Sequence, residues 1–181
     1  MKTIYQEPDE IETLHLELRK IKNVEGDLTE VGVWKGGSAK IIREIIPDKT
    51  LYLFDTFTGI PDDVIEEDKP HGQYFGACQA DESFVQELKL PNTIIVKGVF
   101  PETSDIIKDK KFSFVHIDVD IYKATKDSLE FLFPKLVQEG TMIIHDYPMY
   151  AGVKRAVDEY FLDKKIKTSQ CGIRQLIIKK C

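Results

Sequence analysis

The sequence predicts an α/β fold in which short apolar strands alternate with helices. Three observations support this fold class. The stretch Leu28–Ser38 changes from an apolar strand to a glycine turn and then to a helix start. Two more apolar strands, Thr50–Phe54 and Phe114–Ile117, run directly into Asp55 and Asp118. Polar residues at strand ends, followed by helices, are typical of a sheet that binds its ligand beyond the carboxyl ends of its strands.

Apolar periodicity and turn residues predict each element in order. The expected helices are Glu10–Lys22, Ala39–Ile46, Asp81–Leu90, Thr103–Lys110, Lys123–Leu136 and Gly152–Leu162. The expected strands are Leu28–Val33, Thr50–Phe54, Thr93–Val96, Phe114–Ile117, Thr141–Ile144, Lys165–Ser169 and Arg174–Ile178. We expect Ser38 to cap its helix and Gly140 to end the connection before Thr141. The last two strands have no helix between them, which favours antiparallel pairing.

Length and composition predict one soluble domain over residues 1–181. The net charge of −6 gives no basic surface for nucleic acid, so no nucleic-acid partner is expected. No apolar run is long enough to span a bilayer, and Met1–Lys20 carries too many charges for a signal peptide. The three cysteines, Cys78, Cys171 and Cys181, lack metal-ligand spacing, and their odd number argues against a disulfide framework. These features favour a reducing, cytoplasmic setting and no membrane partner.

The glycine turn is the first candidate binding segment. Gly32, Gly36 and Gly37 permit tight bends and close approach of a ligand to the backbone, and a helix start offers free N–H groups. Glu30 stands where the turn begins, where it would repel a pyrophosphate and suit a cationic amino group and sugar hydroxyls. The turn therefore favours S-adenosylmethionine over a dinucleotide. The alternative is an ordinary strand-to-helix turn.

Two further segments bear on the same ligand. Asp55 ends the second strand and is placed to accept hydrogen bonds from ribose hydroxyls, although it could equally be a turn or cap residue. Gly98, at the end of the third strand, marks an expected adenine edge. The irregular stretch at residues 57–83, with its aromatic pair Tyr74 and Phe75, predicts a lid over the site.

Acidic residues after the later strands form a second candidate site. Asp118 and Asp120 lie too close together to be buried without a reason. A divalent cation, a cationic ligand group or a general-base role would each supply one; the alternative is a helix cap plus a solvent-facing acid. His145 and Asp146 follow the next strand and could complete an oxygen-rich metal site with Asp118. His145 could instead be a hydrogen-bonded structural residue.

Four segments, in this order, resemble the macrocin O-methyltransferase family of class I S-adenosylmethionine-dependent enzymes. They are Glu-Val-Gly-Val-Trp-Lys-Gly-Gly-Ser-Ala (30–39), Leu-Phe-Asp-Thr-Phe-Thr-Gly-Ile-Pro (53–61), His-Ile-Asp-Val-Asp-Ile-Tyr (116–122), and His-Asp-Tyr (145–147) followed by Gly-Val-Lys-Arg-Ala-Val-Asp (152–158). The resemblance implies a Rossmann-like sheet of seven strands in the order 3-2-1-4-5-7-6, with the last strand antiparallel. It also implies methyl transfer to a hydroxyl of a sugar or other secondary metabolite, with Mg2+ assistance.

The resemblance also implies roles for individual residues. Asp118 would be a metal ligand and the candidate general base, and Asp146 a second ligand, with His145 beside them. The residues expected to contact S-adenosylmethionine are Glu30, Gly32, Trp34, Gly36, Gly37, Ser38, Asp55, Thr56, Gly98, Val99 and Asp118.

This chain departs from the family pattern at two places. The family usually has Asp-Asp-Tyr where this chain has His145-Asp146-Tyr147, and a neutral imidazole suits Mg2+ less well than a carboxylate. Only Met1–Asn23, a short helical segment, precedes the first strand. The acceptor pocket is therefore expected to be more open, to be built by a partner subunit of a homodimer, or to be lined by the lid.

Two other functions remain compatible with these residues. One is an inactive module that binds S-adenosylmethionine or another nucleoside, with His145 as the sign of a lost active site. The other is a Rossmann-type oxidoreductase, which Glu30 and the missing third glycine spacing disfavour.

Overall fold

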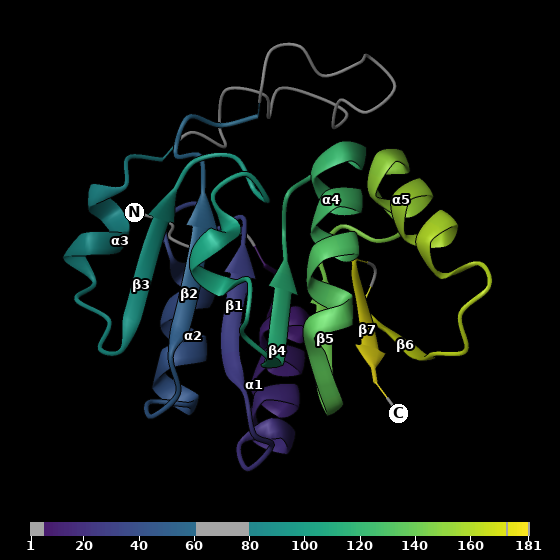
Figure 1. The fold of residues 1–181 in the computed structure, drawn as a ribbon, viewed down its shortest axis with the longest axis horizontal. Helices are drawn as coiled ribbons and strands as arrows, with labels where there is room; N and C mark the ends of the chain where they lie inside the picture. Colours follow the sequence, from purple (N-terminus) through teal and green to yellow (C-terminus); the bar gives the residue numbers. More distant parts are fainter. Residues whose placement is uncertain (1–5, 61–79, 173, 181) are drawn as a thin grey trace.

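A seven-stranded sheet with helices on both faces forms the protein, as seen in a computed structural model that describes residues 6–60, 80–172 and 174–180 (Figure 1). The strands are β1 (Asp27–Val31), β2 (Leu51–Asp55), β3 (Thr93–Lys97), β4 (Phe112–Ile117), β5 (Leu136–Ile144), β6 (Lys167–Cys171) and β7 (Gln175–Lys179). Their order is β3-β2-β1-β4-β5-β7-β6. β1 to β5 pair in parallel, and β7 runs antiparallel to both β5 and β6. The predicted order and the antiparallel last strand are confirmed.

Helices cover the two faces of this sheet as separate layers (Figure 1). They are α1 (Pro8–Ile21), α2 (Gly37–Ile45), α3 (Ser83–Glu87), α4 (Tyr122–Leu132) and α5 (Ala151–Phe161), with short 3-10 turns η3 (Ser104–Ile107) and η4 (Phe133–Lys135). α1 and α2 pack on one face through Leu14, Leu18 and Ile42. α4 and α5 pack on the other through Leu129 and Val157. Every residue of β4 is buried, as expected for a central parallel strand.

The start of α2 differs from the prediction. Its N-cap is Gly36, with φ of 76°, and the helix already includes Gly37 and Ser38. The predicted capping role of Ser38 is therefore wrong. A left-handed backbone at the cap is readily adopted by glycine, which moves the helix start two residues earlier than the serine suggests.

Other boundaries also move. β5 starts at Leu136 and includes Gly140, so the predicted end of a connection at Gly140 is wrong. The chain passes this point through an irregularity, with Glu139 at φ of 62° and a shift in the register with β4. The helix expected to reach Leu136 stops at Leu132, because Pro134 has no backbone N–H to continue the helical hydrogen bonds. The helix expected over Thr103–Lys110 is the single turn η3.

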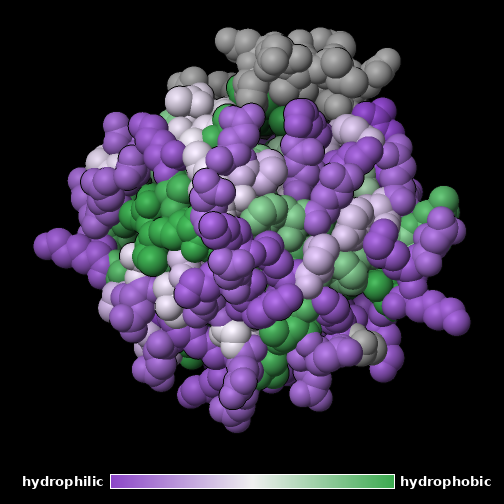
Figure 2. Space-filling view, in the orientation of Figure 1, coloured by the Kyte–Doolittle hydropathy of each residue, from purple (hydrophilic) through white to green (hydrophobic). Residues whose placement is uncertain are grey.

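The surface and the connections complete the fold. Figure 2 shows hydrophilic side chains over most of the face that α4 and α5 cover, and an apolar area on the left, over the edge strand β3. Within the described residues, no helix has the length and apolar character needed to cross a bilayer. The predicted lid at residues 57–83 lies mostly outside the described residues.

Candidate functional site

A cavity of about 470 Å3 opens at the carboxyl ends of the parallel strands. Most of the residues predicted to form a site line it, although they come from five strand ends. The predicted residues that line the cavity are Gly32, Trp34, Gly37, Ser38, Asp55, Thr56, Gly98, Val99, Asp118, His145 and Asp146. Glu30 and Gly36 are not among the lining residues. The sheet therefore gathers the two candidate sites of the sequence into one cavity.

Glu30 lies behind the cavity wall, fully buried. Its Oε1 accepts a 2.5 Å hydrogen bond from the Ser38 hydroxyl and lies 2.7 Å from His116 Nδ1. Gln6 Nε2 lies 3.3 Å from the other ring nitrogen of His116. Burial raises the pKa of Glu30, and the hydrogen bonds from His116 and Ser38 oppose that rise. Ser38, which does line the cavity, thus connects this buried carboxylate to the site.

Asp55 organises the glycine turn from the end of β2. Its Oδ2 accepts hydrogen bonds from the backbone N–H groups of Val33 (2.7 Å) and Trp34 (2.8 Å). Its Oδ1 accepts one from Phe57 at 2.7 Å. Asp55 is therefore a turn residue, the alternative that its sequence context offered, and it also lines the cavity. Its contact with a ribose stays a prediction.

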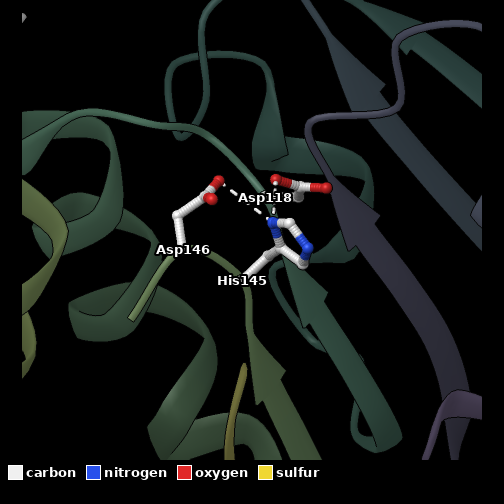
Figure 3. Close-up of side chains that lie close together, drawn as sticks. All are labelled: Asp118, His145 and Asp146. Atoms are coloured by element: carbon white, nitrogen blue, oxygen red, sulfur yellow. Dashed lines mark hydrogen bonds and ion pairs between the residues drawn. The ribbon is translucent and has the colours of Figure 1, made fainter. Parts of the chain in front are cut away.

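Asp118, His145 and Asp146 converge at the ends of β4 and β5, which are neighbours in the sheet (Figure 3). His145 Nδ1 lies 3.3 Å from Asp118 Oδ1 and 3.0 Å from Asp146 Oδ2. Each of the three residues offers one possible metal-ligand atom, and these three atoms all lie within 4.8 Å of one another. His145 and Asp146 are buried, whereas the Asp118 side chain is 28% exposed toward the cavity. The expectation that Asp118 and Asp146 end adjacent strands is confirmed.

The charges of this cluster are strongly coupled. Burial alone would lower the pKa of His145, but the neighbouring carboxylates of Asp118, Asp146 and Glu10 raise that pKa far above its ordinary value. Burial likewise opposes ionisation of Asp118, but the positive charge of His145 outweighs it and lowers the pKa of Asp118. Enclosure beside Asp118 and Asp146 raises the pKa of Asp120 well above its usual range. Asp120 and Asp146 also adopt left-handed backbone conformations, with φ of 65° and 60°, a strain that proteins concentrate at functional sites.

Two polar residues near the site were missed by the sequence reasoning. Glu10, in the first turn of α1, is fully buried, and its Oε2 lies 3.4 Å from His145 Nε2. Ser128, on α4, lines the cavity, is fully buried, and its hydroxyl has no hydrogen-bond partner in the described residues. The sequence did contain a signal for both residues. Glu10 shares the buried face of its helix with Leu14, and Ser128 shares the buried face of its helix with Leu132, where a polar side chain is unusual.

Comparison with known proteins shows the family of the chain. The family described as Macrocin-O-methyltransferase (TylF) matches residues 9–176. Demethyldecarbamoylnovobiocin O-methyltransferase of Streptomyces niveus is 32% identical over 156 residues, which cover 76% of this chain and 59% of that protein. Mycinamicin III 3''-O-methyltransferase of Micromonospora griseorubida is 28% identical over 160 residues, covering 76% of this chain and 61% of its own length.

A solved structure shares the fold closely. The structure of the O-methyltransferase NovP superposes with a TM-score of 0.85 at 26% identity, over 95% of this chain and 79% of that one. The chain spans about three fifths of the length of the curated relatives it matches. The family match extends across nearly all of the sheet and includes every strand end that lines the cavity. The chain belongs to the macrocin O-methyltransferase family.

Proposed function

We propose that the protein is an S-adenosylmethionine-dependent O-methyltransferase that methylates a hydroxyl group of a small molecule, a sugar or another secondary metabolite, with a divalent cation at Asp118, His145 and Asp146. The observation that carries the proposal is the meeting of the glycine turn and the carboxylates of Asp118 and Asp146 in one cavity. The two curated relatives are named O-methyltransferases, one of them acting on mycinamicin III.

The cavity fits a cofactor of this kind. Its volume of about 470 Å3 lies in the usual range of small-molecule sites, roughly 300–1,000 Å3. In this proposal Gly32, Gly37 and Ser38 hold the methionine part, with Glu30 behind them. Asp55 and Thr56 face the ribose, and Gly98 and Val99 the adenine. The N–H groups at the start of α2 suit the carboxylate of the cofactor's amino-acid end, and the Glu30 carboxyl group suits its ammonium group.

The ligand set also fits a cation. Asp146 Oδ1 is buried and accepts no N–H or hydroxyl hydrogen bond from a described residue. Asp118, His145 and Asp146 offer one ring nitrogen and two carboxylate oxygens, all within 4.8 Å of one another, and this donor set would suit a divalent cation. A bound cation would lower the pKa of the acceptor hydroxyl and hold its oxygen in place.

In this proposal the residues of the chain have separate roles in methyl transfer. Asp118 faces the cavity and takes the proton of the acceptor hydroxyl as its oxygen attacks the methyl carbon. S-adenosylmethionine, when bound, would supply the methyl group from its sulfonium sulfur and would be released as S-adenosylhomocysteine. The positive charge of His145 lowers the pKa of Asp118, so a cation that acidified the acceptor hydroxyl would assist the proton transfer. Positioning in a cavity enclosed by five strand ends supplies much of the remaining rate.

Calorimetric titration of the full chain with S-adenosylhomocysteine tests the proposal first. We expect micromolar binding, followed by methyl transfer in a screen of sugars, phenols and other hydroxyl compounds. Asp118→Asn should abolish turnover while the fold and cofactor binding persist. Turnover by that variant would refute the role of Asp118. Cofactor binding without turnover on any acceptor would favour an inactive binding module, and absence of binding would refute the proposal.

A further inference from the structure

His145 is held from both sides of its imidazole ring. Nδ1 faces Asp118 and Asp146, and Figure 3 shows the other ring nitrogen turned away from both carboxylates. That nitrogen, Nε2, lies 3.4 Å from Glu10 Oε2. Glu10 belongs to α1, near the start of the chain, and lies 135 residues before His145 in the sequence. The contact between Glu10 and His145 therefore exists only in the folded protein.

Glu10 is itself fixed in place. Its Oε2 accepts a 2.7 Å hydrogen bond from the backbone N–H of Glu7, the N-cap of α1, as part of a capping box. Its side chain is 1% exposed, and burial of a carboxylate is costly unless a partner compensates it. His145 is the partner that the structure provides at hydrogen-bond range, together with the Glu7 N–H group. The helix start thus presents a rigid acceptor to His145 Nε2–H.

This arrangement is the one in which a histidine serves as a metal ligand. A metal-binding imidazole commonly donates its second ring N–H to a carboxylate, which sets the tautomer and the ring orientation. With Glu10 accepting from Nε2–H, a cation that displaced the Nδ1 proton would meet an Nδ1 lone pair directed at the space between Asp118 and Asp146. The set presented to a cation is then one nitrogen and two carboxylate oxygens.

We propose that this site takes a first-row transition-metal dication, such as Mn2+ or Co2+, in preference to Mg2+, with His145 Nδ1 as a direct ligand and Glu10 as the residue that orients it. The inference rests on the metal clause of the proposed function. Imidazole nitrogen favours borderline transition metals, whereas Mg2+ prefers an all-oxygen shell and gives up its waters reluctantly. Asp118 and Asp146 supply the carboxylates that Mn2+ also accepts.

Direct metal binding is the test, and it needs neither cofactor nor acceptor. The full chain is stripped with a chelator and titrated calorimetrically with Mg2+, Mn2+ and Co2+. We expect Mn2+ and Co2+ to bind about tenfold or more tightly than Mg2+. The visible absorption of bound Co2+ reports nitrogen ligation and should change in His145→Asp. That variant presents three carboxylates, so its preference should shift toward Mg2+.

Glu10→Gln tests the orienting role, because it keeps the size of the side chain and removes its charge. We expect Co2+ affinity to fall about 10- to 100-fold, the usual effect of losing an outer carboxylate. Glu17→Gln is the matched control. Glu17 is a buried glutamate on the same helix, but it pairs with Lys20 and Lys179 rather than with the site. This control should keep the affinity for Co2+.

The outcomes separate this inference from the proposed function. Equal or tighter binding of Mg2+ in the native chain, or an unchanged metal preference in His145→Asp, would overturn the inference and leave methyl transfer intact. Binding of S-adenosylhomocysteine without binding of any dication would overturn it too, and would remove the metal clause alone. Equal losses in Glu10→Gln and Glu17→Gln would refute the role of Glu10. Failure to bind S-adenosylhomocysteine would instead count against the proposed function.

Discussion

The backbone of Asp118 occupies the place where a side chain on Gly32 would begin. A Cβ atom built on Gly32 would lie 1.8 Å from the Asp118 carbonyl oxygen. Gly32 also has φ of 85°, a conformation that residues with a side chain rarely adopt. The two strand ends that carry the glycine turn and the candidate base therefore touch, and their contact depends on the missing side chain.

Gly32→Ala should damage both stability and the site. We expect a loss of roughly 1–3 kcal/mol or more, because backbone strain adds to the displacement of Asp118. Binding of S-adenosylhomocysteine should fall with it. Thermal unfolding and calorimetry measure the two effects. Gly37→Ala is the control for stability, since Gly37 is the first residue of α2 and lacks a positive φ. Equal stability of the two variants would contradict the argument.

Glu30→Gln should weaken binding only of ligands that carry the amino-acid end of the cofactor. The buried carboxyl group lies behind Ser38, and the proposed function assigns it to the ammonium group of the methionine part. We expect S-adenosylhomocysteine to bind roughly tenfold more weakly, as for loss of a charged interaction of about 1.5 kcal/mol. Binding of 5′-methylthioadenosine, which lacks the amino-acid end, should be unchanged. If both ligands weaken equally, Glu30 only supports the turn.

Ser128→Ala should have opposite effects on ligand binding and on stability. The free hydroxyl faces the cavity without a partner among the described residues, so its removal should leave the unliganded protein equally or more stable. If the hydroxyl bonds to bound cofactor, affinity for S-adenosylhomocysteine should fall by a factor of roughly 2 to 12. Thr125→Val serves as control, because the Thr125 hydroxyl donates to the carbonyl oxygen of Ile121, the N-cap of α4. Unchanged affinity in Ser128→Ala would exclude the contact.

The stability of the fold should depend on pH through Glu17. Burial alone would raise the pKa of Glu17, but Lys179 and Lys20, at 2.7 and 2.6 Å, outweigh it and lower that pKa. A lowered pKa stabilises the folded state above the unfolded value of about 4.3, and this stability is lost as pH falls through the folded value. Glu17→Gln should therefore cost roughly 1–3 kcal/mol at pH 7 and less at pH 3. Urea unfolding at the two pH values measures it, and a pH-independent difference would contradict the ion pairing.

Local sequence patterns predicted most of the fold. Apolar strands that end in Asp55 and Asp118, each followed by a helix, predicted the parallel layers, because burial on both faces leaves a continuous apolar run in the sequence. The predicted helix and strand boundaries were wrong where the backbone conformation, rather than the side chain, determines where an element begins or ends. Gly36 caps α2 in place of Ser38, and β5 continues through Gly140 by means of an irregular register.

Some residues of the candidate site could be predicted from the sequence, and others could not. The convergence of Asp118, His145 and Asp146 was predictable from sequence, since the carboxyl ends of neighbouring parallel strands meet at one edge of a sheet. The burial of Glu30 behind Ser38 was not, because it depends on how α2 lies over β1. Nor was Glu10, which lies 135 residues from His145 along the chain.

The sequence by itself determined which strands and helices form, and which polar groups stand at their ends, because hydrophobic periodicity and turn chemistry act over a few residues. Only the tertiary structure decided which of those polar groups meet. The packing of α1 against the sheet placed a buried carboxylate at His145 Nε2, and the packing of α4 placed a hydroxyl in the cavity wall. Such contacts are set by the free energy of burying whole faces of helices and strands, and that quantity belongs to no single segment.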